Sequence, residues 1–248
     1  SPSSAASDVY KRQGYDEVMK EKPNYTRYGG VSISYADGDA SYSRGSGDNH
    51  SRAMNFYVTE MGNKGHYLDV VLRFHHMDTN FKMFDENGKK IRGDMHNVGI
   101  SLSSEYGRKK MIDDKGWYIE PQGQLTLGYL GGDNYTTSNG IAVRQGGIRS
   151  ALGRIGFNLG KDIDEKTNIY LKANLLHEFG GGYHAAMTDS SGSRIKIDHS
   201  FKDTWFEYGI GAAIQTGTNN HVYLDFERSA GGDFKKDWSW NVGARWTF

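Results

Sequence analysis

The chain has 248 residues, with 30 Lys and Arg against 30 Asp and Glu, 33 Gly, 3 Pro and no Cys. The missing cysteines exclude disulfides and thiolate metal sites, and the balanced charge gives no reason to expect a nucleic-acid partner. No stretch is apolar enough for a transmembrane helix, which does not argue against membrane-spanning strands, because their hydropathy signal is weaker.

The first residues stand apart from the rest. Residues 3–13, Ser-Ser-Ala-Ala-Ser-Asp-Val-Tyr-Lys-Arg-Gln, are similar to the in-frame translation of an adapter used to prepare sequencing libraries. We therefore expect residues 1–13 to be an adapter-derived or non-native segment and exclude them from fold reasoning. The alternative is a natural linker rich in Ser and Ala.

From there on, segments of alternating polarity recur between clusters of Gly, Asp, Asn, Ser and Lys, which predicts strands joined by turns. The predicted strands cover residues 27–36, 54–60, 66–75, 96–107, 117–130, 150–160, 168–179, 204–215, 220–228 and 238–248. An all-β, antiparallel fold follows from this pattern.

Within these segments one face is apolar and the other is polar. In 66–75, for example, Leu68 and Leu72 oppose Asp69 and Arg73. The polar faces carry charge of both signs, which a dry core would not tolerate but a water-filled lumen would. The predicted lumen-facing charges are Asp69, Arg73, Glu105, Glu120, Arg154, Lys172, Glu207, Asp225 and Arg245.

The connections support the same class of fold. Short links such as 61–65 and 216–219 alternate with longer polar links at 37–53, 76–95, 131–149 and 180–203. Outer-membrane barrels alternate short periplasmic turns with long external loops. We therefore predict an antiparallel transmembrane β-barrel in the bacterial outer membrane, with a periplasmic C-terminus.

The last segment shows the alternation most clearly. Its apolar face holds Trp240, Val242, Ala244, Trp246 and Phe248, and its other face is small or polar. A lipid-facing strand with aromatic residues at the interface has this pattern.

Taken in order, the segments resemble the C-terminal β-domain of autotransporters, the translocator barrel of type V secretion. The matching pieces include Gly14-Tyr15-Asp16, Tyr28–Tyr35, Tyr57-Val58-Thr59, Gly65–Asp69, Ser103–Gly107, Trp117–Gln122, Gly153–Gly156, Trp205–Gly209 and Gly243–Phe248. The resemblance covers residues 14–248. It implies a barrel of about twelve strands, of which about ten are recognisable here. We therefore expect the first strands and the pore-threading segment to be missing.

The resemblance also implies a function and partners. Residues 14–248 would insert in the outer membrane and support export of an N-terminal passenger that this chain does not contain. The implied partners are the lipid bilayer, the passenger and the barrel-assembly machinery. The final apolar face, Trp240 to Phe248, would be the C-terminal assembly signal, read by pairing of an exposed edge with a strand of the insertase.

No cofactor, metal site or catalytic residue is predicted. His75 and Asp78 lie where a surface protease barrel would keep such residues, but the neighbouring His75 and His76 point to opposite faces of a strand. Glu105, Glu120 and Glu207 could cleave a passenger or could form a lattice of salt bridges with lumenal cations, and we favour the lattice. A surface enzyme barrel of the omptin or lipid-hydrolase type and a small diffusion porin are the alternative functions.

Overall fold

The computed structural model describes residues 5–42, 44–216, 221–233 and 236–245. These residues form β-strands joined by turns and irregular links. Two antiparallel sheets account for all the strands in these ranges. In the part of the chain that the structure describes, no helix has the length and hydropathy of a membrane span.

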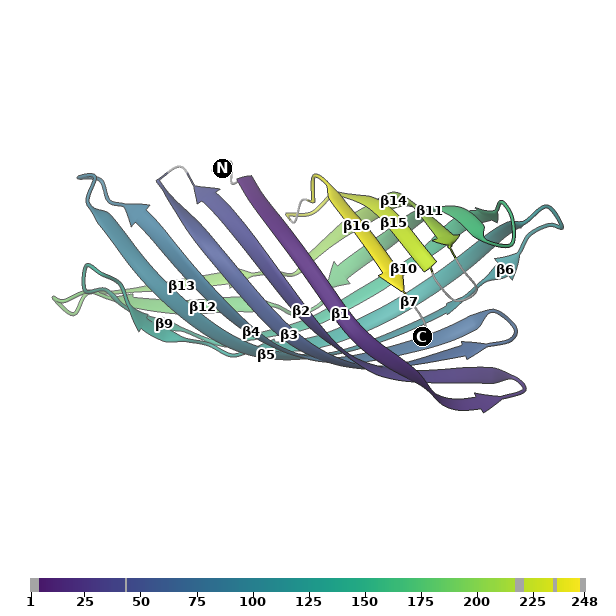
Figure 1. Ribbon diagram of the computed structural model, residues 1–248. Helices are drawn as coiled ribbons and strands as arrows, with labels where there is room; N and C mark the ends of the chain where they lie inside the picture. Colours follow the sequence, from purple (N-terminus) through teal and green to yellow (C-terminus); the bar gives the residue numbers. More distant parts are fainter. Residues whose placement is uncertain (1–4, 43, 217–220, 234–235, 246–248) are drawn as a thin grey trace.

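The larger sheet has twelve strands, with β6 paired beside β7 at its border. Its strands are β1 (Ala5–Lys22), β2 (Tyr25–Tyr42), β3 (Gly45–Gly62), β4 (His66–Phe84), β5 (Lys90–Arg108), β6 (Lys110–Met111), β7 (Trp117–Leu130), β10 (Ile148–Asp162), β11 (Thr167–Glu178), β14 (Asp203–Gln215), β15 (His221–Ala230) and β16 (Ser239–Arg245). Apart from β6, each strand of this sheet pairs with the next one in chain order, and the sheet curls into a half-barrel (Figure 1). Among the described residues β1 and β16 form its two edges.

All ten segments predicted from the alternating pattern are strands of this sheet, and β1 adds another at its first edge. Residues 5–22 form β1 and pair with β2 from Tyr25 to Ser41. They include most of the segment that was excluded from fold reasoning. The prediction of about ten strands therefore agrees with this sheet, to which β1 and the two-residue β6 are the additions.

The long polar links at 37–53 and 76–95 were wrongly predicted as loops. The ladder between β2 and β3 continues to Tyr42 and Gly45, and the ladder between β4 and β5 continues to Phe84 and Lys90. Between Phe74 and Phe84 the outward positions of β4 are polar, so the pattern of an apolar outer face stops. The backbone hydrogen bonds of a ladder do not need that signal and continue.

The other two long links form a sheet of their own. Strands β8 (Asn134–Thr136), β9 (Ala142–Gln145), β12 (Gly182–Thr188) and β13 (Arg194–Ser200) pair in the order β13-β12-β9-β8. This small sheet lies at the same end of the molecule as the extended β4 and β5 hairpin (Figure 1). One end of the half-barrel therefore carries long, regular hairpins.

The opposite end carries tight turns. Gly65 and Gly116 have φ of 79° and 89°, a conformation that residues with a side chain rarely adopt. In the turn between β10 and β11, Asp164 accepts hydrogen bonds of 2.7 Å from the N–H groups of Lys166 and Thr167. These bonds, that of Lys166 foremost, lower the pKa of the Asp164 carboxyl. Such turns match the short periplasmic side of a barrel.

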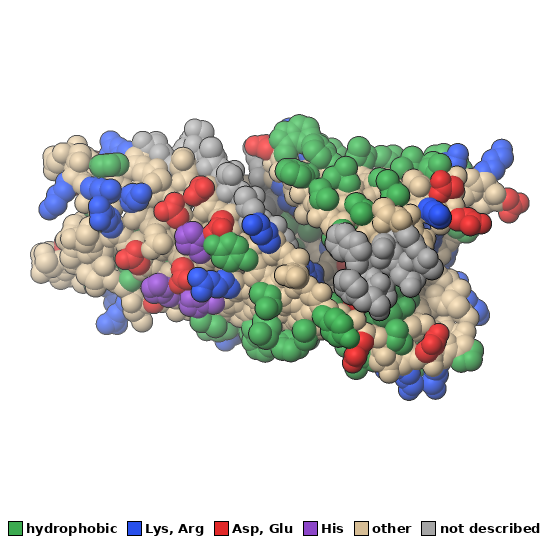
Figure 2. All heavy atoms as spheres, viewed as in Figure 1, with side chains coloured by type: hydrophobic (Ala, Val, Ile, Leu, Met, Phe, Trp, Pro, Cys, Tyr) green, Lys and Arg blue, Asp and Glu red, His purple; other side chains and the backbone are tan. Residues whose placement is uncertain are grey.

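Apolar side chains gather on the outer surface, not in a core (Figure 2). The outer face of the larger sheet forms a continuous apolar band, in which Leu102 is 47% exposed and Ile155 64%. The most buried positions on the concave side are polar, as at Ser34 and Asn55, which are 1% and 3% exposed. This distribution is the reverse of that in a water-soluble protein and fits a transmembrane sheet.

On the concave side, tyrosine rings lie over glycines of the neighbouring strand. A Cβ atom at Gly211 would come within 2.3 Å of Cζ of Tyr170, its partner across the β11–β14 ladder. The phenol of Tyr170 donates a 2.6 Å hydrogen bond to Asp225. The glycine thus leaves the space in which the ring lies flat and reaches a carboxylate two strands away.

We expect Gly211→Ala to lower the free energy of unfolding by about 1–3 kcal/mol, because the added methyl group forces the Tyr170 ring to shift. Urea-induced unfolding of the refolded protein measures this. Gly123→Ala is the matched control, since a Cβ at Gly123 would meet nothing within 4 Å. That variant should stay within about 0.5 kcal/mol of the parent, and equal losses in both would contradict the packing argument.

Candidate functional site

The concave face holds two groups of charged side chains, and the first is built around Arg154. The guanidinium of Arg154 lies 2.8 Å from a Glu105 carboxylate oxygen, and its side chain is 15% exposed. It also donates hydrogen bonds to the amide oxygens of Gln122, Gln124 and Asn174 at 2.8–3.1 Å. Strands β5, β7, β10 and β11 therefore meet at one fixed cation.

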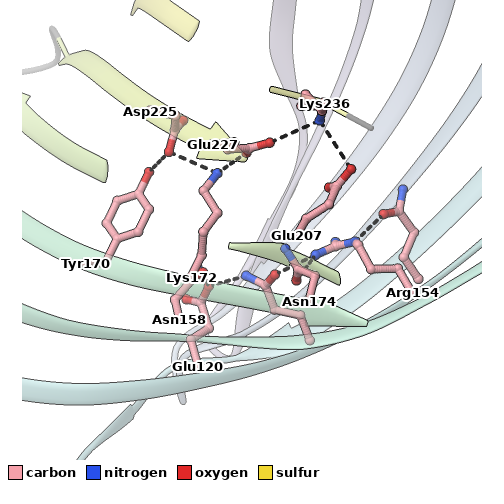
Figure 3. Close-up of polar contacts among 12 residues, drawn as sticks. Glu120, Arg154, Asn158, Tyr170, Lys172, Asn174, Glu207, Asp225, Glu227 and Lys236 are labelled. Atoms are coloured by element: carbon pink, nitrogen blue, oxygen red, sulfur yellow. Dashed lines mark hydrogen bonds and ion pairs between the residues drawn. The ribbon is translucent and has the colours of Figure 1, made fainter. Parts of the chain in front are cut away.

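The second group is built around Lys172 on β11 (Figure 3). Its ammonium lies 3.1 Å from Asp225 and forms a shorter ion pair with Glu227, both on β15. The three side chains are only 13–16% exposed. Because β14 runs between β11 and β15, these pairs span an entire strand of the sheet.

Lys236 joins this group, and the sequence pattern did not indicate it. Its ammonium lies 3.2 Å from Glu207 and 3.5 Å from Glu227 (Figure 3). The backbone N–H of Lys236 donates to the Ser229 hydroxyl, and its carbonyl accepts from the backbone N–H of Ser229. These two bonds hold the link after β15 against the concave face. Lys236 lies in a link without alternation, so no periodic signal could have assigned it to a face.

The structure places the remaining predicted charges as follows. Asp69 accepts a 2.6 Å hydrogen bond from Thr59, and Glu120 accepts bonds from Gln122 and Asn158. Arg73 lies between Asn55 and Ser101 across the two adjoining ladders. Arg245 pairs with His221 through its backbone, and its side chain lies outside the described residues.

Between the two groups lies an open polar hollow of about 400 Å³. Its lining includes Gln122, Arg154, Lys172, Asn174 and Glu227. Glu105 and Glu207 are both held in ion pairs, so they stabilise the sheet across its strands. This lining offers hydrogen-bond donors, hydrogen-bond acceptors and charges of both signs to a polar chain that passes along it.

The final strand turns its apolar residues away from the hollow. Trp240 and Val242 are 69% and 61% exposed on the outer face, and Ala244 lies on the same side. They continue the outer face of β15, where Phe226 is the cross-strand partner of Trp240. Trp246 and Phe248 lie outside the described residues.

The structure separates His75 from Asp78. The His75 ring lies on the concave side over Gly99, whose Cβ position would be 2.2 Å from the ring nitrogen Nε2. Asp78 points to the outer face, where it bonds to His76 and His96. Since His75 and Asp78 lie on opposite faces of β4, they cannot act together on one substrate.

An apolar outer band, a charged concave face and strands that extend as hairpins beyond the band at one end only define a transmembrane sheet of the outer-membrane type. The model of the autotransporter β-domain family matches residues 14–227. The chain therefore belongs to the autotransporter β-domain family, whose members are outer-membrane barrels.

Individual relatives agree with this family. The chain is 31% identical over 241 residues to the pertactin autotransporter of Bordetella parapertussis, covering 95% of this chain and 25% of the relative. The chain thus spans about a quarter of the length of that protein.

Solved structures share the fold. The β-domain of the Bordetella autotransporter BrkA superposes with a TM-score of 0.79 at 24% identity, covering 99% of this chain and 92% of that one. The translocator domain of the autotransporter NalP from Neisseria meningitidis gives 0.66 at 12% identity, covering 96% and 78%.

Proposed function

We propose that this β-domain supports export of an N-terminal passenger through the outer membrane to the cell surface. The observation that carries the proposal is the charge-balanced polar hollow on the concave side of a sheet whose outer face is apolar. A passing peptide needs backbone hydrogen-bond partners that lipid cannot supply, and the lumenal amides and ion pairs supply them.

Surface display of the passenger tests this function. An epitope-tagged passenger encoded upstream, in frame with this chain, should be cut by protease added to intact cells. Removing residues 203–248 should leave the tag protected while the passenger is still made. Equal surface exposure of the tag without these residues would overturn the proposal.

The sidedness of the domain belongs to the same proposal. β16 ends opposite His221, at the end of the sheet that carries the tight turns. We place this end and the C-terminus in the periplasm and the extended hairpins outside the cell. Asp69, Arg73, Glu105, Glu120, Arg154, Lys172, Glu207, Asp225 and Arg245 are then lumenal.

The barrel-assembly machinery is the proposed partner of the last strand. We expect Phe248→Ser in the full-length parent to reduce outer-membrane insertion while leaving expression unchanged, because an edge strand with its terminal aromatic would pair with the insertase. Heat-modifiable migration of membrane fractions measures insertion. Normal insertion of this variant would remove the signal role and leave interface anchoring for Phe248.

We propose no catalytic role for this chain. The separation of His75 from Asp78 and the ion pairs of Glu105 and Glu207 support this. Hydrolysis of a peptide or a lipid by the purified chain, lost in the Asp78→Asn variant, would contradict it.

A separate proposal concerns the first residues. We propose that residues 1–13 are not native to the protein and that residues 14–248 are the native translocator domain. The family match, which begins at residue 14, supports this proposal. The coding sequence upstream at the source locus tests it, since an uninterrupted native reading frame through residues 1–13 would refute it.

A further inference from the structure

Beyond the end of the apolar band, two histidines and an aspartate meet on the outer face of β4 and β5. His76 and Asp78 are two residues apart on β4 and so share a face, and His96 on β5 is the cross-strand partner of Asp78. Asp78 Oδ1 lies 2.9 Å from His76 Nε2 and 2.6 Å from His96 Nδ1. The two imidazole rings are stacked, with centroids 6.5 Å apart and planes 17° apart.

We propose that His76, Asp78 and His96 bind one divalent transition-metal ion of the zinc type. The proposal is independent of passenger export. One ligand atom from each of the three side chains lies within 4.8 Å of the other two. Ligands of a tetrahedral zinc ion are about 3.3 Å apart, given Zn–N and Zn–O distances near 2 Å. The widest separation among the three ligand atoms therefore has to close by no more than about 1.5 Å, which side-chain rotations can supply without movement of the sheet.

The type of ligand selects the type of ion. Two imidazoles and one carboxylate suit zinc and its neighbours in the transition series, whereas calcium and magnesium prefer oxygen ligands alone. Nearby charge also favours a cation, since Asp94 and Asp133 act electrostatically on His96 in addition to Asp78. One guanidinium, that of Arg52, is on the neighbouring strand opposite His76.

The backbone that carries the three ligands is held firmly, and the ligand side chains themselves are open to solvent. The ligands come from the longest ladder of the sheet, and Asp133 further fixes β5 by accepting a 2.7 Å hydrogen bond from the backbone N–H of His96. His76 and His96 are 46% and 63% exposed, so an ion can enter from solvent. The remaining coordination positions would be filled by water. In Figure 2, His side chains lie among acidic and basic side chains, away from the larger apolar patches.

Zinc binding to the refolded 248-residue chain, prepared without a histidine tag, tests the site. Equilibrium dialysis should give one ion per chain. His76→Asn and His96→Asn should each weaken binding about tenfold or more, because even loss of an outer-shell partner costs a metal site that much. His184→Asn is the matched control, since His184 forms a comparable 2.5 Å pair with Asp198 at an exposed site on β12 and β13. That variant should bind as the parent does.

A second measurement on the parent chain does not depend on how the variants fold. Bound Co²⁺ should give the strong visible absorption of a site with few ligands, and Zn²⁺ should displace it. Zinc should also raise the melting temperature, because it binds only the folded chain. The absence of saturable binding, a six-coordinate cobalt spectrum, or equal loss of binding in the His184→Asn variant would each overturn the proposal.

Discussion

Replacing Lys172 by Met should lower the free energy of unfolding by about 3–5 kcal/mol, since removing one partner of a largely buried ion pair leaves the other uncompensated. Here two carboxylates, Asp225 and Glu227, would face each other across the space that the ammonium occupied. Urea-induced unfolding of the domain in lipid bilayers measures the change.

Two further variants isolate the cause. Adding Glu227→Gln to Lys172→Met removes one of the two stranded charges and should recover part of the loss. Arg27→Met breaks the 2.6 Å pair between Arg27 and Glu60, whose side chains are 40% and 26% exposed, and should cost much less stability than Lys172→Met, because solvent screens an exposed ion pair. If Arg27→Met were as harmful as Lys172→Met, partial burial would not be the reason for the loss.

The second large effect concerns the outer face. Leu102→Lys should destabilise the domain in bilayers by about 2–4 kcal/mol, because it places an ammonium among lipid tails. Leu102 lies within the apolar band, between Leu72 on β4 and Leu127 on β7. Equilibrium unfolding in vesicles gives the comparison with the parent.

Phe84→Lys provides the control for this prediction. Phe84 is 46% exposed, similar to Leu102, and has the same outward position on its strand, but it lies in the part of β4 beyond the band. The same substitution there should change stability by less than about 0.5 kcal/mol. A large loss at Phe84 would mean that lipid tails reach the extended hairpins, which would contradict the proposed position of the bilayer.

The strands that contact lipid could be predicted from the sequence because two solvents act on them. Lipid on one side and a wet lumen on the other impose a period of two, as at Leu68 to Arg73. From His76 to Lys82 the outward positions are polar, and Met77, Phe81 and Met83 lie on the concave side, so the apolar outer face ends although the ladder continues to Phe84. The hairpins outside the band were therefore assigned to loops.

The contacts within the site were harder to predict than its faces. Arg154 could be assigned to the lumen from β10 alone, but its pairing with Glu105 depends on registers across two ladders. Lys236 carries no periodic signal at all. The grouping of His76, Asp78 and His96 also depends on register, since His96 is distant in sequence from the other two.

With the sidedness proposed above, the extended hairpins determine which surface is accessible from outside the cell. At about 3.3 Å per residue and a tilt of about 40°, a strand of 19 residues such as β4 rises roughly 48 Å, almost twice the apolar band of about 25 Å. About half of it stands above the lipid tails as hydrogen-bonded sheet. An antibody that recognises residues 76–95 would therefore bind an epitope assembled from alternate residues of two strands, and a flexible peptide of the same sequence would be a poor immunogen for it.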